Sequence, residues 1–242
     1  ARHSPQEQED LVLQAAARCI EESSLLDFKM ASIAKQAGLS MGSVYKHIQS
    51  KEDVLVALAT RMGKQHVEVF AAIVALPLTM PERLMAGMLV TPDKLHTYPF
   101  GIHLEMLVNH ESVLSRASPR WTASYAREVD ALERVFHGSM IDAWSNGELQ
   151  VEEPQRDDVI AAILTTLWSM STGFTHISYQ GPAQGDAHEV PFPLAVDHPL
   201  IKAAKVLINT GGGDLTPPPW THPLDDEGVR RACALLEERG YR

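Results

Sequence analysis

The sequence predicts an all-α protein, in which a small N-terminal three-helix domain with a helix-turn-helix precedes a larger helical domain. Three observations support this fold class. Apolar residues recur at steps of three and four along most of the chain. A tight turn at Gly38 separates two short helical patterns. Proline and glycine elsewhere stand where helices are expected to begin or end.

The most informative stretch covers residues 28–55 and predicts two short helices followed by the start of a third. In the first helix Ile33 and Ala34 form an apolar face, and Gly38 then allows a sharp turn with a positive φ. Ser40 can accept a backbone N–H bond as the cap of the second helix. Such a pair is a helix-turn-helix, whose second helix enters the DNA major groove.

The second helix of this pair has two distinct faces. Val44 and Ile48 are four residues apart and should point inward. The residues left largely outward are Met41, Ser43, Tyr45, Lys46 and His47. Ser50 and Asp53 then form a capping-box pattern at the start of the next helix.

The local charge agrees with a DNA contact. Residues 28–51 contain four lysines (Lys29, Lys35, Lys46 and Lys51) and no acidic residue, whereas the whole chain has a net charge of −10. A basic window in an acidic protein is a candidate phosphate-binding patch. The alternative is an ordinary solvated helical hairpin, because motif matches of this kind have false positives.

The segment IAKQAGLSMGSVYKHIQSKEDVL, residues 33–55, resembles the DNA-binding signature of the tetracycline-repressor (TetR) family of bacterial regulators. The matching positions are Ile33, Ala34, Ala37, Gly38, Leu39, Ser40, Gly42, Tyr45, His47, Lys51 and Leu55. Two positions differ from the family pattern. Lys29 replaces a threonine that usually caps the first helix of the pair, and Ile48 replaces an aromatic residue.

The resemblance implies roles for individual residues. Tyr45, His47 and Lys51 would contact phosphates, while Met41, Ser43 and Lys46 would reach base edges or backbone. The full set of expected DNA-binding residues is Lys29, Ser40, Met41, Ser43, Tyr45, Lys46, His47 and Lys51.

Composition limits the remaining possibilities. The 242 residues are enough for one large or two modest domains. The two cysteines, Cys19 and Cys233, are far apart and form no CxxC or zinc-binding pattern, so a disulfide framework is not expected. The start of the sequence shows no export signal. We therefore expect a cytoplasmic protein.

Helices are expected throughout the rest of the chain. An N-terminal helix should start at Ser4-Pro5, where Ser4 and Glu7 form a capping-box pattern. Its apolar face should consist of Val12, Ala15, Ala16, Cys19 and Ile20. Other helices should cover residues 81–97, interrupted at Thr91-Pro92, and 99–113. A long helix should run from Ser118-Pro119 to Asn146-Gly147. The next, near 156–180, has no charged residue from Val159 to Gln180, yet its many polar groups argue against a membrane span.

Three parts are expected: a DNA-binding domain at 1–55, a helical effector-binding and dimerisation domain at 56–210, and an extension at 211–242. The resemblance implies a homodimer formed through the helices near 156–180 and 198–209, which would bind a palindromic operator. Residues 181–197 should be a loop, and 211–223 a linker of flexible glycines and stiff prolines. A short amphipathic helix should follow at 225–239, with Val229, Ala232, Cys233 and Leu236 on its inward face.

The resemblance also implies a small, apolar or aromatic effector bound among the helices of the middle domain. The candidate lining residues are His96, Tyr98, Phe100, His103, Met106, Leu107, Trp121, Tyr125, Trp144 and Trp168. Plain core packing would give the same pattern, because such pockets are apolar. His103 and His110 are seven residues apart, but a metal site needs further ligands, so we expect neither a metal nor a cofactor.

The predicted function is sequence-specific DNA binding by a regulator, in the form of a repressor released by its effector. A ligand-independent or activating regulator would have the same sequence features, and so would a ligand-binding module that has lost DNA affinity. An enzyme is not expected, because the chain contains no phosphate loop, GxSxG or HExxH motif.

Overall fold

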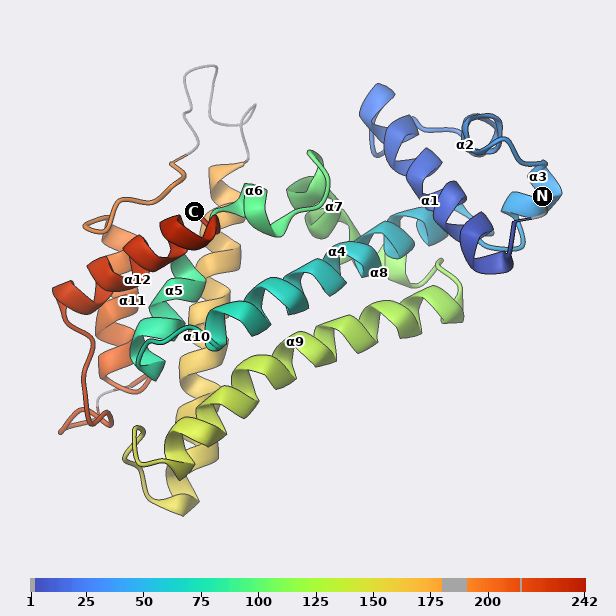
Figure 1. Cartoon of the computed structure of the whole chain (residues 1–242). Coiled ribbons are helices and arrows are strands. Elements are labelled where there is room, and N and C mark those ends of the chain that lie inside the picture. The colour runs from blue at the N-terminus through green and yellow to red at the C-terminus, as the bar shows by residue number, and fades with distance from the viewer. Residues whose placement is uncertain (1–2, 180–190, 214) are drawn as a thin grey trace. The chain divides into compact units, whose positions relative to one another are not determined.

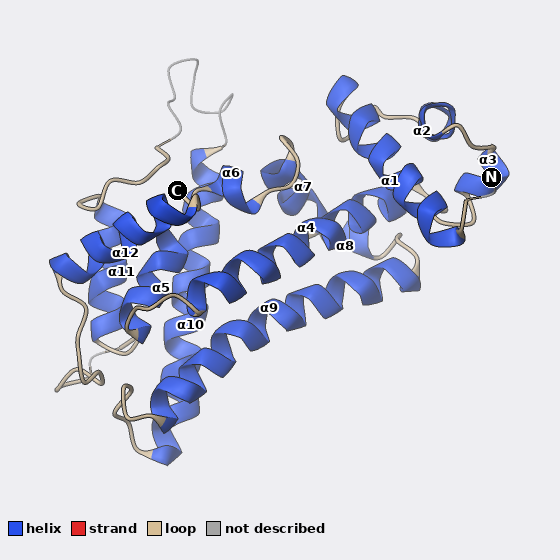
Figure 2. Cartoon of the chain, in the orientation of Figure 1, coloured by secondary structure: helices blue, strands red, loops and turns tan. Residues whose placement is uncertain are grey.

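The computed structural model describes residues 3–179, 191–213 and 215–242. Within these ranges the regular structure is helical, apart from an isolated bridge between Leu149 and Trp220 (Figure 2). The all-α prediction is therefore confirmed. The chain divides into two compact units, the first formed by residues 1–65 and 96–130 and the second by residues 66–95 and 131–242.

The first unit begins with α1 (Pro5–Glu22) (Figure 1). Its predicted capping box is present: the Glu7 N–H donates to Ser4 Oγ at 3.2 Å, and the Ser4 N–H donates to the Glu7 carboxylate at 2.6 Å. The predicted apolar face is buried, including Val12 and Cys19. Burial also raises the pKa of the Cys19 thiol, which fits a packing role.

The helix-turn-helix consists of α2 (Met30–Ala37) and α3 (Met41–Val44), followed by α4 (Lys51–Val74). α7 (Gly101–Val108), α8 (Glu111–Leu114) and the first turns of α9 (Pro119–Ser145) complete this unit. The core around α2 and α3 includes four buried residues from these later helices: Leu104, Val108, Val113 and Trp121. The helix-turn-helix therefore shares its core with residues far along the sequence.

The single helix predicted at 99–113 is wrong, because α7 and α8 are separate. α7 ends with Asn109 as its cap residue, and His110 takes an extended conformation in front of α8. The His110 imidazole accepts the Ser112 N–H at 3.2 Å, so this side chain caps a new helix instead of continuing the old one.

The second unit is built around α5 (Met80–Leu89), which contacts both α11 (Pro199–Asn209) and α12 (Asp226–Arg239). α6 (Pro92–Leu95) and α10 (Glu153–Ser178) also belong to this unit. α10 begins three residues before the start predicted from the sequence, and the predicted end at Gln180 lies outside the described residues. Most of the predicted loop at 181–197 also lies outside them.

The C-terminal strap, which we define as residues 211–213 and 215–224, is packed against the second unit. Gly211, Pro219 and Trp220 are buried, and the Trp220 indole N–H donates to the Ile208 carbonyl at 2.6 Å. The Thr221 N–H donates to the Glu148 carbonyl at 3.0 Å. Because of these contacts the segment is not the flexible linker that its glycines suggested.

α12 confirms the predicted amphipathic helix and packs on α5 of the same chain. The face predicted to point inward is buried, with Val229, Ala232 and Leu236 among its residues. Arg231 of α12 forms an ion pair with the buried Glu82 of α5.

No helix in the described part of the chain combines the length and hydropathy needed to cross a membrane. α10 instead exposes isolated large apolar side chains: Trp168 is 56% exposed and Ile177 is 57% exposed.

Candidate DNA-binding site

The turn between α2 and α3 has the predicted geometry. Gly38 adopts φ 65° and ψ 30°, the left-handed conformation that glycine tolerates best. The Leu39 N–H donates to the Ala34 carbonyl at 3.0 Å, which closes the end of α2. Ser40 then caps α3, because its Oγ accepts the Ser43 N–H at 3.1 Å.

This turn presents α3 with an apolar face and an open face. Val44 and Ile48 are fully buried, as predicted. Tyr45 is 45% exposed and Lys46 is also exposed. Met41 and Ser43 are half-buried, so they lie at the edge of the open face.

Two of the expected phosphate-binding residues already have partners within the protein. His47 Nδ1 lies 3.6 Å from the Glu9 carboxylate of α1. Lys51 donates to the Leu26 carbonyl at 3.0 Å, and its ammonium lies 4.9 Å from the centre of the Phe28 ring. Both contacts fix the side chains beside the open face, and neither partner was anticipated from the sequence.

The start of α2 lacks a side-chain cap. Lys29 occupies the cap position with an extended backbone, and no side-chain bond satisfies the first N–H groups of the helix. Lys29 is exposed, so its charge remains in solvent next to these N–H groups.

Asp53 has a role that the capping-box pattern only partly predicted. Ser50 Oγ accepts the Asp53 N–H at 3.0 Å, as expected. The Asp53 carboxylate, however, accepts the N–H of Gln49 at 2.8 Å and the N–H of Ser118 at 2.6 Å. This buried side chain therefore joins the turn after α3 to the turn before α9.

Residues 12–58, which contain this helix-turn-helix, match the family described as bacterial regulatory proteins, tetR family. The N-terminal helix-turn-helix domain of this chain belongs to the TetR family.

Several solved structures share this fold. The regulator FadR from Bacillus subtilis, in complex with stearoyl-CoA, is 18% identical, with 85% of this chain and 98% of that chain covered and a TM-score of 0.51. A TetR/AcrR-family regulator from Thermobifida fusca is also 18% identical, with 97% and 98% covered and a TM-score of 0.51. The superantigen PfiT is 15% identical, with 84% and 97% covered and a TM-score of 0.53. No curated protein matches the chain.

The residues predicted to bind an effector are divided between the two units. His96, Tyr98, Phe100, His103, Met106, Leu107, Trp121 and Tyr125 belong to the first unit, whereas Trp144 and Trp168 belong to the second. Trp144 donates to the Val151 carbonyl at 2.9 Å, and Trp168 and His103 are exposed.

Several of the candidates in the first unit contact one another or nearby polar groups. The Tyr98 and Phe100 rings stack with their centres 5.1 Å apart, and His96 Nε2 lies 3.2 Å from the Glu105 carboxylate. The Tyr125 hydroxyl donates to the Asn109 side chain at 3.1 Å. Burial, with a smaller contribution from the charge of Glu105, raises the pKa of Tyr125 to about 12.

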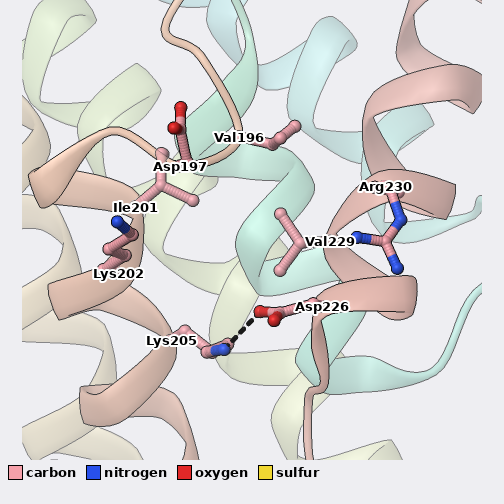
Figure 3. Close-up of a pocket in the computed structure, with 8 residues that line it drawn as sticks. All are labelled: Val196, Asp197, Ile201, Lys202, Lys205, Asp226, Val229 and Arg230. Carbon is pink, nitrogen blue, oxygen red and sulfur yellow. Dashed lines mark hydrogen bonds and ion pairs between the residues drawn. The ribbon is translucent and has the colours of Figure 1, made fainter.

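One small pocket lies elsewhere, in the second unit. It has a volume of about 140 Å³ and is lined by residues of α11, α12 and the segment before α11 (Figure 3). Lys205 and Asp226 form an ion pair at its edge with a separation of 2.5 Å, and this bond lowers the pKa of Asp226. None of the predicted effector residues lines it.

The described residues contain no group of three or more His, Cys, Asp or Glu side chains placed to hold a metal ion. In particular, the His110 imidazole already bonds to Ser112.

Proposed function

We propose that this protein is a transcriptional regulator that binds a specific duplex DNA sequence through α3. The observation that supports the proposal is the division of α3 and its following turn into two faces. Val44 and Ile48 are fully buried, whereas Tyr45 and Lys46 face solvent beside a turn that matches the TetR family. A short helix with one buried face and one polar, exposed face suits the major groove.

The charge of this region supports a phosphate contact. Lys29, Lys35, Lys46 and Lys51 lie within 24 residues that include no acidic side chain. Tyr45, Lys46, His47 and Lys51 supply phosphate affinity in this proposal, so binding should weaken steeply with added salt. Met41 and Ser43, at the edge of the open face, are the proposed base-reading residues.

The protein acts as a homodimer in this proposal. Trp168 and Ile177 of α10 and Val206 of α11 are each more than half exposed, although they are large and apolar. Charged residues are absent from 159–179, so a second copy could approach α10 without burying unpaired charges. Two copies would place two α3 helices on two half-sites of a palindrome.

Release by a small molecule completes the proposal, with the protein acting as a repressor. An effector can shift the protein from a DNA-binding to a non-binding form only through different affinities for the two forms. The structure of the FadR neighbour contains stearoyl-CoA, so a long acyl chain is one apolar chemistry to test here.

A second candidate is a ligand-binding module that has lost DNA affinity. Two observations favour it: Lys29 leaves α2 without a side-chain cap, and residues 1–55 have six basic and eight acidic residues, a balance of −2. The fold is also that of the superantigen PfiT, so fold alone does not decide between the candidates.

Selection from a random duplex library at physiological salt tests these alternatives. Recovery of a palindromic site supports a dimeric, sequence-specific regulator. Binding that falls with salt but enriches no sequence would contradict sequence specificity. Failure to retain any duplex, from protein that is folded and dimeric, would favour the second candidate.

A further inference from the structure

A hydrogen bond from α9 to the turn after α3 reveals a role for a residue outside the helix-turn-helix. The Trp121 side chain is 5% exposed and lies in the core that surrounds α2 and α3. Its indole N–H donates to the backbone carbonyl of His47 at 3.0 Å. The acceptor is therefore part of the turn that follows α3, 74 residues earlier in the sequence.

The turn that receives this bond needs external support. α3 has only four residues, and such a short helix has little stability of its own. The His47 and Ile48 N–H groups both donate to the Val44 carbonyl, at 2.9 and 3.0 Å, which forms a tight turn. The carbonyls at the end of a helix lack partners within it, and Trp121 supplies one for His47.

Neighbouring contacts hold the same two segments together. The Asp53 carboxylate accepts N–H bonds from Gln49 and Ser118, so it connects the end of this turn to the residues just before α9. Arg120 forms an ion pair with Glu9, and the Glu9 carboxylate also faces His47. The Arg120 guanidinium lies 4.7 Å from the centre of the Trp121 ring. The backbone is thus held on both sides of Ile48: Trp121 bonds to the His47 carbonyl, and Asp53, the partner of Ser118, bonds to the Gln49 N–H.

We propose that Trp121 is a positioning residue for DNA recognition. It holds the His47 carbonyl and thereby fixes the orientation of Tyr45, Lys46 and His47 toward the duplex. Trp121 needs no contact with DNA for this role, and the inference rests on the DNA-binding function proposed above. This role differs from the sequence-based prediction that Trp121 lines an effector pocket.

The second unit offers a matched control. Trp220 is 3% exposed, and its indole N–H also donates to a backbone carbonyl, that of Ile208, at 2.6 Å. Trp121→Phe and Trp220→Phe therefore remove the same kind of bond from equally buried sites. Only the first removes a bond to the turn that follows α3.

The test measures the dissociation constant of each full-length variant for the selected duplex and for an unrelated duplex. Trp121→Phe should weaken binding to the selected duplex about tenfold, a loss typical of a hydrogen bond that fixes a binding group. Its effect on the unrelated duplex should be less than twofold, because phosphate charge remains. Trp220→Phe should leave both constants unchanged. Equal losses for the two variants, or no loss for Trp121→Phe, would overturn the proposal.

Amide hydrogen exchange without DNA gives a second readout. The His47 and Ile48 amides should exchange faster in Trp121→Phe than in the native protein and in Trp220→Phe. If the native protein binds no duplex, the proposed function fails, but this measurement still decides whether Trp121 orders the turn. Unchanged exchange would refute that role.

If Trp121→Phe does not fold, benzothienylalanine can be incorporated at position 121. This residue keeps the bicyclic ring and replaces only the N–H group by sulfur. The same tenfold loss and faster exchange are expected, and native values for both would overturn the proposal.

Discussion

The helix-turn-helix and the C-terminal strap both turn at a glycine with a positive φ, but for different physical reasons. Gly38 follows α2 with φ 65°, and a Cβ added there would meet no atom within 4 Å. Gly212 follows α11 with φ 78°, and a Cβ there would lie 2.8 Å from the backbone carbonyl carbon of Ala162 in α10. The first turn requires glycine for its dihedral angle alone, whereas the second also requires it for close packing. The difference fits an open turn beside a proposed DNA surface and a closed turn packed against α10.

The largest stability effect should come from the closed turn. Gly212→Ala combines an unfavourable positive φ with a clash against backbone that cannot move independently, so we expect a loss of about 3 kcal/mol in the free energy of unfolding. Gly213→Ala is the control, because a Cβ there meets nothing within 4 Å and the residue has no positive φ. Urea denaturation compares them, and equal losses would show that the close contact is unimportant.

The next largest effect is on DNA binding, at the exposed residues that follow the Gly38 turn. Replacing both Tyr45 and Lys46 with Ala should weaken binding to the selected duplex at least 100-fold, about 2.7 kcal/mol. Both side chains are exposed, so the free energy of unfolding and the dimer should remain close to native. Titration with labelled duplex measures the affinity, urea denaturation the free energy of unfolding, and sedimentation the dimer. Native affinity in the double variant would mean that α3 is not the recognition helix.

A smaller loss in the free energy of unfolding is expected when Gly38, in the open turn, is replaced. Gly38→Ala introduces only the strain of the left-handed conformation, which costs about 1 kcal/mol. Gly38→Asn should cost less, since asparagine tolerates this conformation better than alanine. Thermal or urea unfolding provides the comparison with Gly212→Ala. A loss at Gly38 as large as that at Gly212 would remove the distinction between the turns.

The smallest effect is a change of stability with pH, which arises from Tyr125 in the core of the first unit. The fold raises the pKa of Tyr125 from 10.0 to about 12, because burial favours the neutral phenol. The resulting stabilisation is fully present below pH 10 and is lost as the pH rises through about 12. Absorbance at 295 nm should show a high-pH ionisation that Tyr125→Phe removes. An unchanged titration curve above pH 11 in that variant would contradict the assignment.

Local signals in the sequence were enough to predict several elements. The Ser4 and Glu7 capping box, the Gly38 turn and the buried positions Val44 and Ile48 each depend on residues within a few positions of one another. The same holds for α12, whose apolar residues repeat at helical spacing. These features form wherever the local sequence allows them, so they could be identified before the core was known.

Features that depend on distant contacts were not predictable in this way. The glycines and prolines of the C-terminal strap suggested a linker, because the sequence does not reveal that α10 packs against Gly212. Trp121 was grouped with effector residues, since a buried aromatic residue has the same spacing in a core as in a pocket. Asp53 resembled a simple capping residue, and only the fold brings Ser118 to its carboxylate.

The shared core of the first unit has a consequence for the order of folding during synthesis. The bond between His47 and Trp121 closes a loop of 74 residues, and Leu104, Val108 and Val113 fill the same core. A nascent chain that has emerged only as far as residue 58 contains the whole family match but lacks these four side chains. Contacts between distant residues form late, so the proposed DNA-binding surface should be complete only after the start of α9 has emerged from the ribosome.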